Sequence, residues 1–113
     1  SPITFSYRVR ETTDVLDPQS ELLLYGHAKS DEMREHLKAR ALKRVVVVDE
    51  QVFALYGDRI HAYFEAHGVD VKLMVLPTTE ENKDMEMVME IAKAIDEHGI
   101  DRRYDPVIAI GGG

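Results

Sequence analysis

The sequence has 113 residues, of which 44% are hydrophobic and 31% charged, as expected of one small globular domain that is short for a complete α/β enzyme. A formal net charge of −7 argues against nucleic-acid binding, and no apolar run approaches the roughly 18 residues of a membrane span. The sequence contains no cysteine, which excludes disulfides and thiolate metal sites, and it has no secretory signal pattern, so we expect a cytoplasmic protein.

The first predicted element is a strand near the N-terminus. In residues 3–11 the apolar side chains of Phe5, Tyr7 and Val9 alternate with polar ones. This pattern is typical of a half-buried strand, which we expect to be antiparallel and close to a sheet edge. Residues 21–29 are compatible with either a short helix or a strand, and their pattern leaves both open.

A helix is predicted over residues 30–44. Ser30 can cap its N-terminus, acidic residues fill its first turn and basic residues fill its last, as the helix dipole favours. The residues expected on its buried side are Met33, Leu37 and Leu42.

The clearest strand of the sequence is Val45–Val48. Four consecutive β-branched residues without alternation indicate burial on both faces of a sheet. Asp49 follows this strand, and a helix after it is expected to end at Gly68, because glycine is favoured just beyond a helix C-terminus. The residues expected on the core side of this helix are Val52, Leu55, Tyr56, Ile60 and Phe64.

A further strand and helix are predicted over residues 69–99. The strand is closed by Pro77, and Thr78 and Glu81 stand at capping-box spacing where the helix begins. The helix is expected to end at Gly99. Its apolar face comprises Met85, Val88, Ile91, Ala92 and Ile95.

Residues 107–110 form a last, fully apolar strand, so strands and helices alternate from about residue 45 onward. This order predicts an α/β fold, a Rossmann-like domain with a mainly parallel sheet and right-handed crossovers. Ligands of such sheets bind beyond the carboxyl ends of the strands. Three features gather there: Asp49, the segment PTTEENK over residues 77–83, and the three glycines 111–113.

Each of these features also has a purely structural interpretation. Asp49 is either a helix N-cap, the more frequent role, or an acceptor for the two hydroxyls of an adenosine ribose. Glu80 and Lys83 form either a surface pair or part of a site. Residues 111–113 are either a linker or bare backbone presented to a phosphate. The sequence contains neither of the common nucleotide fingerprints GxGxxG and GxxxxGK[ST].

The histidines and methionines do not predict a metal or redox site. The histidines lack any known ligand spacing, and we interpret all five as structural or solvated: His27, His36, His61, His67 and His98. The methionines of the last helix fit core or surface positions better than a redox role: Met85, Met87 and Met89.

Three segments of the sequence resemble one family. They are VVVVDEQVFALYGDRIHAYFEAHGVDVKLMVLP (residues 45–77), TEENK (residues 79–83) and IDEHGIDRRYDPVIAIGGG (residues 95–113). Together they closely resemble the N-terminal domain of sugar phosphate cyclases, the dehydroquinate synthase superfamily, and within it most the 2-epi-5-epi-valiolone synthases. The resemblance implies that residues 1–113 are an NAD-binding α/β domain that stops at its glycine-rich loop.

The resemblance also implies the residues of an NAD site. Asp49 matches the strand-end acid placed on the adenosine ribose, and Gln51 stands near the same ribose. Glu80 and Lys83 match an E-x-x-K pair near the nicotinamide-side ribose and the phosphates. The glycine-rich turn that packs against the pyrophosphate is matched by Gly111, Gly112 and Gly113.

The activity implied by the resemblance belongs to a longer protein. NAD would transiently oxidise a hydroxyl of a sugar phosphate, here sedoheptulose 7-phosphate, phosphate would be eliminated, and the hydride would return before ring closure to 2-epi-5-epi-valiolone. A second, helical domain outside this chain would bring zinc or cobalt, so we expect the isolated chain to be inactive. The complete protein would be a homodimer that binds neither nucleic acid nor membrane.

Three alternatives remain open on the sequence. The first is a 3-dehydroquinate synthase or another sugar phosphate cyclase. The second is an iron-type alcohol or glycerol dehydrogenase, which shares a GGG-bearing N-terminal domain of similar plan. The third, of another class, is a non-catalytic nucleotide-binding α/β module.

Overall fold

The computed structural model describes residues 4–9, 16–77, 85–100 and 105–112. Within these ranges four strands and four helices follow one another along the chain, and no helix is long and apolar enough to cross a membrane. In order they are β1 (Thr4–Val9), α1 (Leu22–Tyr25), α2 (Asp31–Lys38), β2 (Lys43–Asp49), α3 (Glu50–Ala66), β3 (Asp70–Leu76), α4 (Met85–His98) and β4 (Val107–Gly112).

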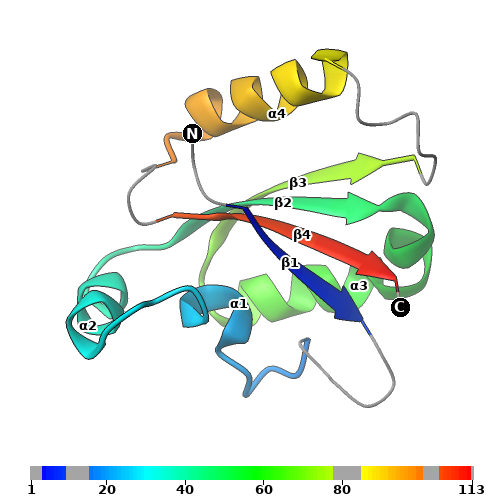
Figure 1. The fold of residues 1–113 in the computed structure, drawn as a ribbon. Coiled ribbons are helices and arrows are strands. Elements are labelled where there is room, and N and C mark those ends of the chain that lie inside the picture. Colours follow the sequence, from blue (N-terminus) through cyan, green and yellow to red (C-terminus); the bar gives the residue numbers. More distant parts are fainter. Residues whose placement is uncertain (1–3, 10–15, 78–84, 101–104, 113) are drawn as a thin grey trace.

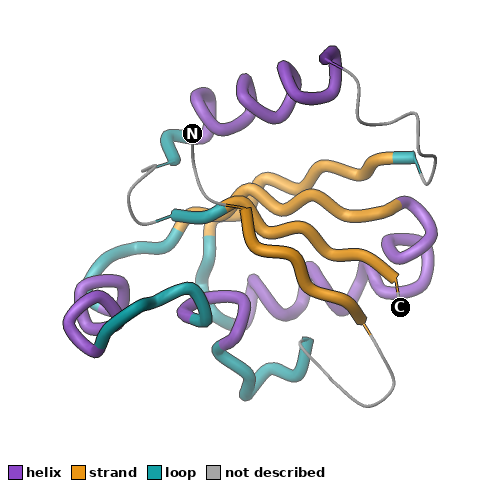
Figure 2. Tube along the Cα trace, viewed as in Figure 1, coloured by secondary structure: helices purple, strands orange, loops and turns teal. Residues whose placement is uncertain are grey.

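The four strands form one parallel sheet with the order β1-β4-β2-β3 (Figure 1). Helices α3 and α4 lie on opposite faces of this sheet (Figure 2). The chain therefore passes from β2 to β3 through one helix, and from β3 back across β2 to β4 through the other. This arrangement confirms the expected α/β fold with a Rossmann-like parallel sheet.

The N-terminal strand β1 lies at an edge of the sheet, as expected, but its predicted antiparallel direction is wrong. It pairs in parallel with β4, from Thr4 opposite Val107 to Val9 opposite Gly112. An edge strand with one covered face gives the same alternation of apolar residues in either direction, so the pattern of this strand could not fix its direction.

Strand β2 forms the centre of the sheet because it pairs with both β3 and β4. The side chains of Val45, Val46 and Val48 are all 0% exposed, which confirms the predicted burial on both faces. Val46 and Val48 pack on the α3 side, whereas Val45 packs with Ile95 of α4 on the other side. The uniform valine run therefore supplies the core of two layers at once.

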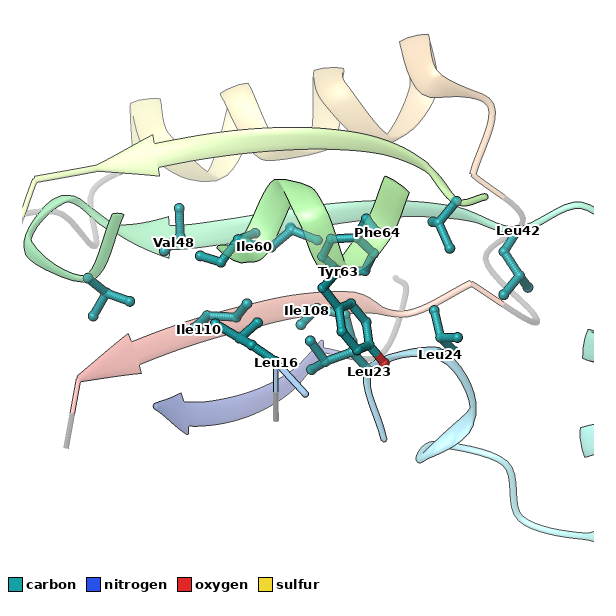
Figure 3. Close-up of a cluster of buried hydrophobic side chains, with 13 residues drawn as sticks. Leu16, Leu23, Leu24, Leu42, Val48, Ile60, Tyr63, Phe64, Ile108 and Ile110 are labelled. Atoms are coloured by element: carbon teal, nitrogen blue, oxygen red, sulfur yellow. The ribbon is translucent and has the colours of Figure 1, made fainter. Parts of the chain in front are cut away.

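The larger core lies between the sheet and α3 (Figure 3). Its residues come from β2, β4, α3, α1 and the segments next to them: Leu16, Leu23, Leu24, Leu42, Val46, Val48, Val52, Ile60, Tyr63, Phe64, Val69, Ile108 and Ile110. Helix α3 stops where expected, since Gly68 has a φ of 65°. One core residue was wrongly predicted, because Leu55 faces solvent and is 77% exposed. Tyr63, which the periodicity did not single out, is fully buried.

Tyr63 links α3 to the segment that precedes α1. Its hydroxyl donates a hydrogen bond of 2.6 Å to the backbone oxygen of Ser20. We expect Tyr63→Phe to lower the free energy of unfolding by about 0.5–1.5 kcal/mol, because it removes this bond and leaves the ring in place. Urea unfolding of the two proteins measures the difference. Equal midpoints and slopes would show that water replaces the hydroxyl at no cost.

The segment left open in the sequence, residues 21–29, contains the short helix α1. Helix α2 begins as predicted, since the hydroxyl of Ser30 accepts a hydrogen bond of 3.1 Å from the backbone N–H of Met33. It ends at Lys38, however, and not at residue 44. The reason is that Lys43 already pairs with β3 as the first residue of β2. Leu42 is buried as expected, but in the connection to β2.

Helix α4 ends as predicted, because Gly99 has a φ of 72°. On its described side chains, Ile95 is buried and Ile91 is half-buried, whereas Ala92 is exposed and was wrongly placed on the apolar face. Ala94 is buried instead. The capping-box residues Thr78 and Glu81 lie outside the described residues.

Candidate functional site

The carboxyl ends of the four parallel strands meet at one edge of the molecule (Figure 1). The register places Asp49 opposite Leu76 of β3 and Val48 opposite Ile110 of β4. Gly111 follows Ile110 and Asp49 follows Val48, so the strand-end acid and the first glycine reach the same edge on neighbouring strands. Two of the three features that the sequence predicted to converge are thus brought together by the backbone.

This edge is also the point where the chain leaves neighbouring strands in opposite directions. From β2 it enters α3 on one face of the sheet, and from β3 it leads to α4 on the other face (Figure 2). In open α/β sheets, ligands bind at such a switch point, outside the carboxyl ends of the strands. Asp49 is the last residue of β2 and stands at this point.

Asp49 caps helix α3. Its Oδ1 atom accepts hydrogen bonds from the backbone N–H groups of Gln51, at 2.8 Å, and Val52, at 3.3 Å. The structural interpretation of Asp49 is thereby confirmed. A carboxylate has about four acceptor positions, so capping through one oxygen is compatible with further acceptor bonds. Asp49 is half-buried and stands at the N-terminus of α3, at the carboxyl end of β2.

Gly111 and Gly112 continue strand β4 and are not part of a turn. They pair with Arg8 and Val9 of β1, so the predicted strand of residues 107–110 is two residues longer than expected. No described atom lies within 4 Å of the position that a Cβ of Gly111 would occupy, and its φ is not positive. The described fold therefore does not require glycine at this position. Gly113 lies outside the described residues.

Two further predicted site residues, Glu80 and Lys83, also lie outside the described residues, so their roles stay predictions. Gln51 is exposed on the first turn of α3. Two histidines hold neighbouring segments together, since Nε2 of His67 is 2.7 Å from the backbone oxygen of Pro18 and Nε2 of His98 is 2.9 Å from that of Asp70. In the part of the chain that the structure describes, no three potential ligands form a metal cluster.

The sequence reasoning missed a buried ion cluster at the amino-terminal ends of β2 and β4, opposite to the candidate site. Arg44, at the start of β2, is 0% exposed, and Asp105, just before β4, is 1% exposed. Nη1 of Arg44 donates to Oδ1 of Asp105 at 2.9 Å, and Arg40 donates to both oxygens of Asp105 at 3.1 and 3.3 Å. Two signals were available in the sequence. One is an arginine directly before the valine run, and the other is an Asp-Pro pair directly before another apolar strand.

Burial shapes the charge balance of this cluster. Desolvation lowers the pKa of the Arg44 guanidinium, while the charge of Asp105 and its hydrogen bond oppose the shift. An arginine stays protonated at neutral pH even so, so the positive charge remains inside the protein. Asp105 therefore compensates a buried cation, and removing it would leave that charge without its partner.

Comparison with known proteins shows the family of this chain. Residues 26–113 match the family described as iron-containing alcohol dehydrogenase, and the chain belongs to this family. It is also similar to sugar phosphate cyclases, since it is 38% identical over 112 residues to a 2-epi-5-epi-valiolone synthase of Actinomyces, covering 97% of this chain and 27% of the relative. A synthase of the same name from Streptomyces albus is 39% identical over 109 residues, which cover 96% and 24% of the two chains.

A 3-dehydroquinate synthase of Rhizobium rhizogenes is 38% identical over 82 residues, which cover 73% of this chain and 21% of the relative. The chain thus spans about a quarter of the length of the curated relatives it matches. Among solved structures, a 2-epi-5-epi-valiolone synthase of Streptomyces hygroscopicus subsp. jinggangensis, with NAD⁺ and Zn²⁺ bound, has 27% identity and a TM-score of 0.49. It covers 89% of this chain and 22% of the other, and at this score it adds no weight to the assignment.

Proposed function

We propose that this chain is the NAD-binding part of a sugar phosphate cyclase that converts sedoheptulose 7-phosphate to 2-epi-5-epi-valiolone with loss of phosphate. The observation that carries the proposal is the similarity to two 2-epi-5-epi-valiolone synthases, at 38% and 39% identity over 97% and 96% of the chain. Asp49 and Gly111 lie at the carboxyl ends of two neighbouring strands, and this position supports the cofactor assignment.

The described residues fit the adenosine and pyrophosphate half of NAD. Asp49 ends a buried strand, where a carboxylate can accept from ribose hydroxyls, and Gln51 lies on the adjoining helical turn. Gly111 offers bare strand backbone with open space where a side chain would stand. Since only backbone without a Cβ can approach a pyrophosphate closely, this open space is what the cofactor would need.

The remaining cofactor roles stay proposals. Gly112 and Gly113 would continue the contact with the pyrophosphate, and Glu80 and Lys83 would hold the nicotinamide half. When bound, NAD supplies a reversible acceptor for a hydride from the sugar. The contribution of this chain is to bind the cofactor and fix its orientation, since a misplaced reacting group lowers the rate steeply.

A divalent metal, zinc or cobalt, would be bound by residues outside this chain. The described ranges contain no group of three potential ligands, so none of them is assigned to the metal. The complete protein would be a cytoplasmic homodimer, and this chain alone would be inactive because the metal ligands and most groups that contact the sugar phosphate would lie outside it.

A second candidate is the 3-dehydroquinate synthase reaction. It is favoured by the relative from Rhizobium rhizogenes, which matches 73% of the chain at 38% identity. Both candidates are phosphate-eliminating cyclases, so the cofactor site proposed above serves either reaction. They differ in the sugar phosphate, most of whose contacts would lie outside this chain.

Product analysis of the full-length protein distinguishes these candidates. The protein is incubated with NAD, Zn²⁺ or Co²⁺ and each of three substrates: sedoheptulose 7-phosphate, the seven-carbon precursor of dehydroquinate, and glucose 6-phosphate. We expect inorganic phosphate and 2-epi-5-epi-valiolone from the first substrate alone. Dehydroquinate from the second would establish the alternative cyclase. No phosphate release from any of the three sugars, together with net NAD reduction in a parallel assay with an alcohol, would refute both candidates.

A further inference from the structure

Strands β2 and β4 have an apolar pattern that does not define how they align. Val45–Val48 are identical residues, and Val107–Ile110 are all apolar. A shift of two residues keeps every side chain on its original face of the sheet, so the hydrophobic effect distinguishes such alignments only weakly. The structure nevertheless has one defined register, with Val45 opposite Val107 and Val48 opposite Ile110.

The ion pair of Arg44 and Asp105 lies directly before these paired residues. Arg44 also donates hydrogen bonds to the backbone oxygens of Leu24, at 2.6 Å, and Lys43, at 2.7 Å, so its guanidinium is fixed in place. A slip of two residues would move β4 by about 6.6 Å, at roughly 3.3 Å per residue. The 2.9 Å bond to Asp105 would then break and leave a buried charge unpaired. Only the observed register satisfies the pair.

The register fixed at the amino-terminal ends of β2 and β4 also determines how their carboxyl ends align. Strand β4 runs without interruption from Val107 to Gly112, and β2 runs from Lys43 to Asp49. A shift of β4 would therefore carry Gly111 past Asp49 by the same distance. The alignment of Gly111 with Asp49 therefore depends on the ion pair at the other end of these two strands.

We propose that Arg44 and Asp105 are positioning residues, which fix the register of β2 and β4 and so place Gly111 beside Asp49 for the dinucleotide. The inference rests on the proposed function, because it assumes that NAD binds at this edge. In this view the buried pair selects one strand alignment over others, as buried ionic groups do in some proteins. Its contribution to stability is secondary.

The test replaces the pair by apolar residues in the full-length protein, as Arg44→Met with Asp105→Leu. Replacement of a buried ion pair by hydrophobic residues of similar size is often neutral for stability. Arg40 also loses its partner Asp105, but its side chain is 29% exposed and can turn to water, so we expect a Tm close to that of the wild type. The NAD dissociation constant is expected to rise at least tenfold, because the apolar strands no longer select one register. Isothermal titration with NAD, well below the Tm, measures it.

A matched control is Leu37→Ala in α2. Leu37 is fully buried but lies outside the four strands, so this variant should lower the Tm and leave NAD affinity within twofold of the wild type. A purely structural role for the ion pair predicts instead that affinity follows Tm in every variant. If the double variant does not fold, Asp105→Asn takes its place. It is expected to lower the Tm, as Leu37→Ala does, but to raise the NAD dissociation constant at least tenfold, which Leu37→Ala does not.

Wild-type NAD affinity in a folded double variant, or in Asp105→Asn, overturns the positioning role and leaves the proposed function intact. Absence of NAD binding by the wild type contradicts the proposed function instead. A crystal structure of the double variant shows the register directly. A shifted β4 supports the positioning role. Val47 opposite Ala109, as in the wild type, overturns it.

Discussion

Replacing Gly111 by valine in the full-length protein is expected to weaken NAD binding roughly a hundredfold or more, which corresponds to about 2.8 kcal/mol or more. The valine side chain would fill the open space beside the strand and keep the pyrophosphate away from the backbone. The fold itself should tolerate the change, because Gly111 lies in a strand with ordinary φ and β-branched residues suit strands. Titration with NAD, together with a thermal unfolding curve, gives both quantities.

The control for this prediction is Gly68→Ala. Gly68 likewise has no described atom within 4 Å of its Cβ position, but its φ of 65° makes any side chain strained. The substitution should cost about 1–2 kcal/mol of stability. NAD affinity should stay unchanged, since Gly68 follows α3, far along the chain from the strand edge. An unchanged affinity in Gly111→Val would mean that the pyrophosphate does not contact this strand.

The second large effect is expected at Asp49, where the structure allows two roles to be separated. Asp49→Ala removes both the helix cap and the carboxylate, whereas Asp49→Ser keeps a good N-cap and loses only the carboxylate. Charge-assisted hydrogen bonds contribute about 1.5–3 kcal/mol. Both variants should therefore bind NAD roughly ten- to a hundredfold more weakly. Selectivity against NADP should relax in both, because a carboxylate repels a 2′-phosphate.

Stability separates the two Asp49 variants. The alanine variant should lose about 0.5–2 kcal/mol of unfolding free energy with its cap, and the serine variant should lose little. NAD titration and chemical unfolding of wild type, Asp49→Ala and Asp49→Ser at one salt concentration provide the comparison. If Asp49→Ser binds NAD as the wild type does, Asp49 acts only as a helix cap, and the cofactor site would depend on the glycine end of β4.

The central layer of the fold could be predicted from the sequence because its signals are local. Val45–Val48 can be accommodated only where both faces are covered, and Gly68 and Gly99 stop two helices through their positive φ. The direction of β1 could not be predicted, because it depends on a partner strand a hundred positions away. Leu55 was misplaced because apolar spacing does not show which side of a long helix meets the sheet.

The candidate site was predictable to a similar extent. Asp49 could be predicted as a site residue because it directly follows a run of valines that marks a buried strand. Its capping role follows from the same position. The strand conformation of Gly111 was not foreseen, since its pairing with Arg8 is a contact between distant segments. The partnership of Arg44 and Asp105 was missed for the same reason, because 61 residues separate them and neither lies in a recognisable motif.

The pairing of β1 with β4 has a consequence for synthesis on the ribosome. Thr4 pairs with Val107, so 103 residues must be added after the first strand before its partner exists. At about 5–20 residues per second, the strand waits for roughly 5–20 s. During that time β2, α3 and β3 can already assemble, since each adjoins the next in sequence. Of the four described strands, β1 is translated first, and it can pair only after β4, the last of them, has been made.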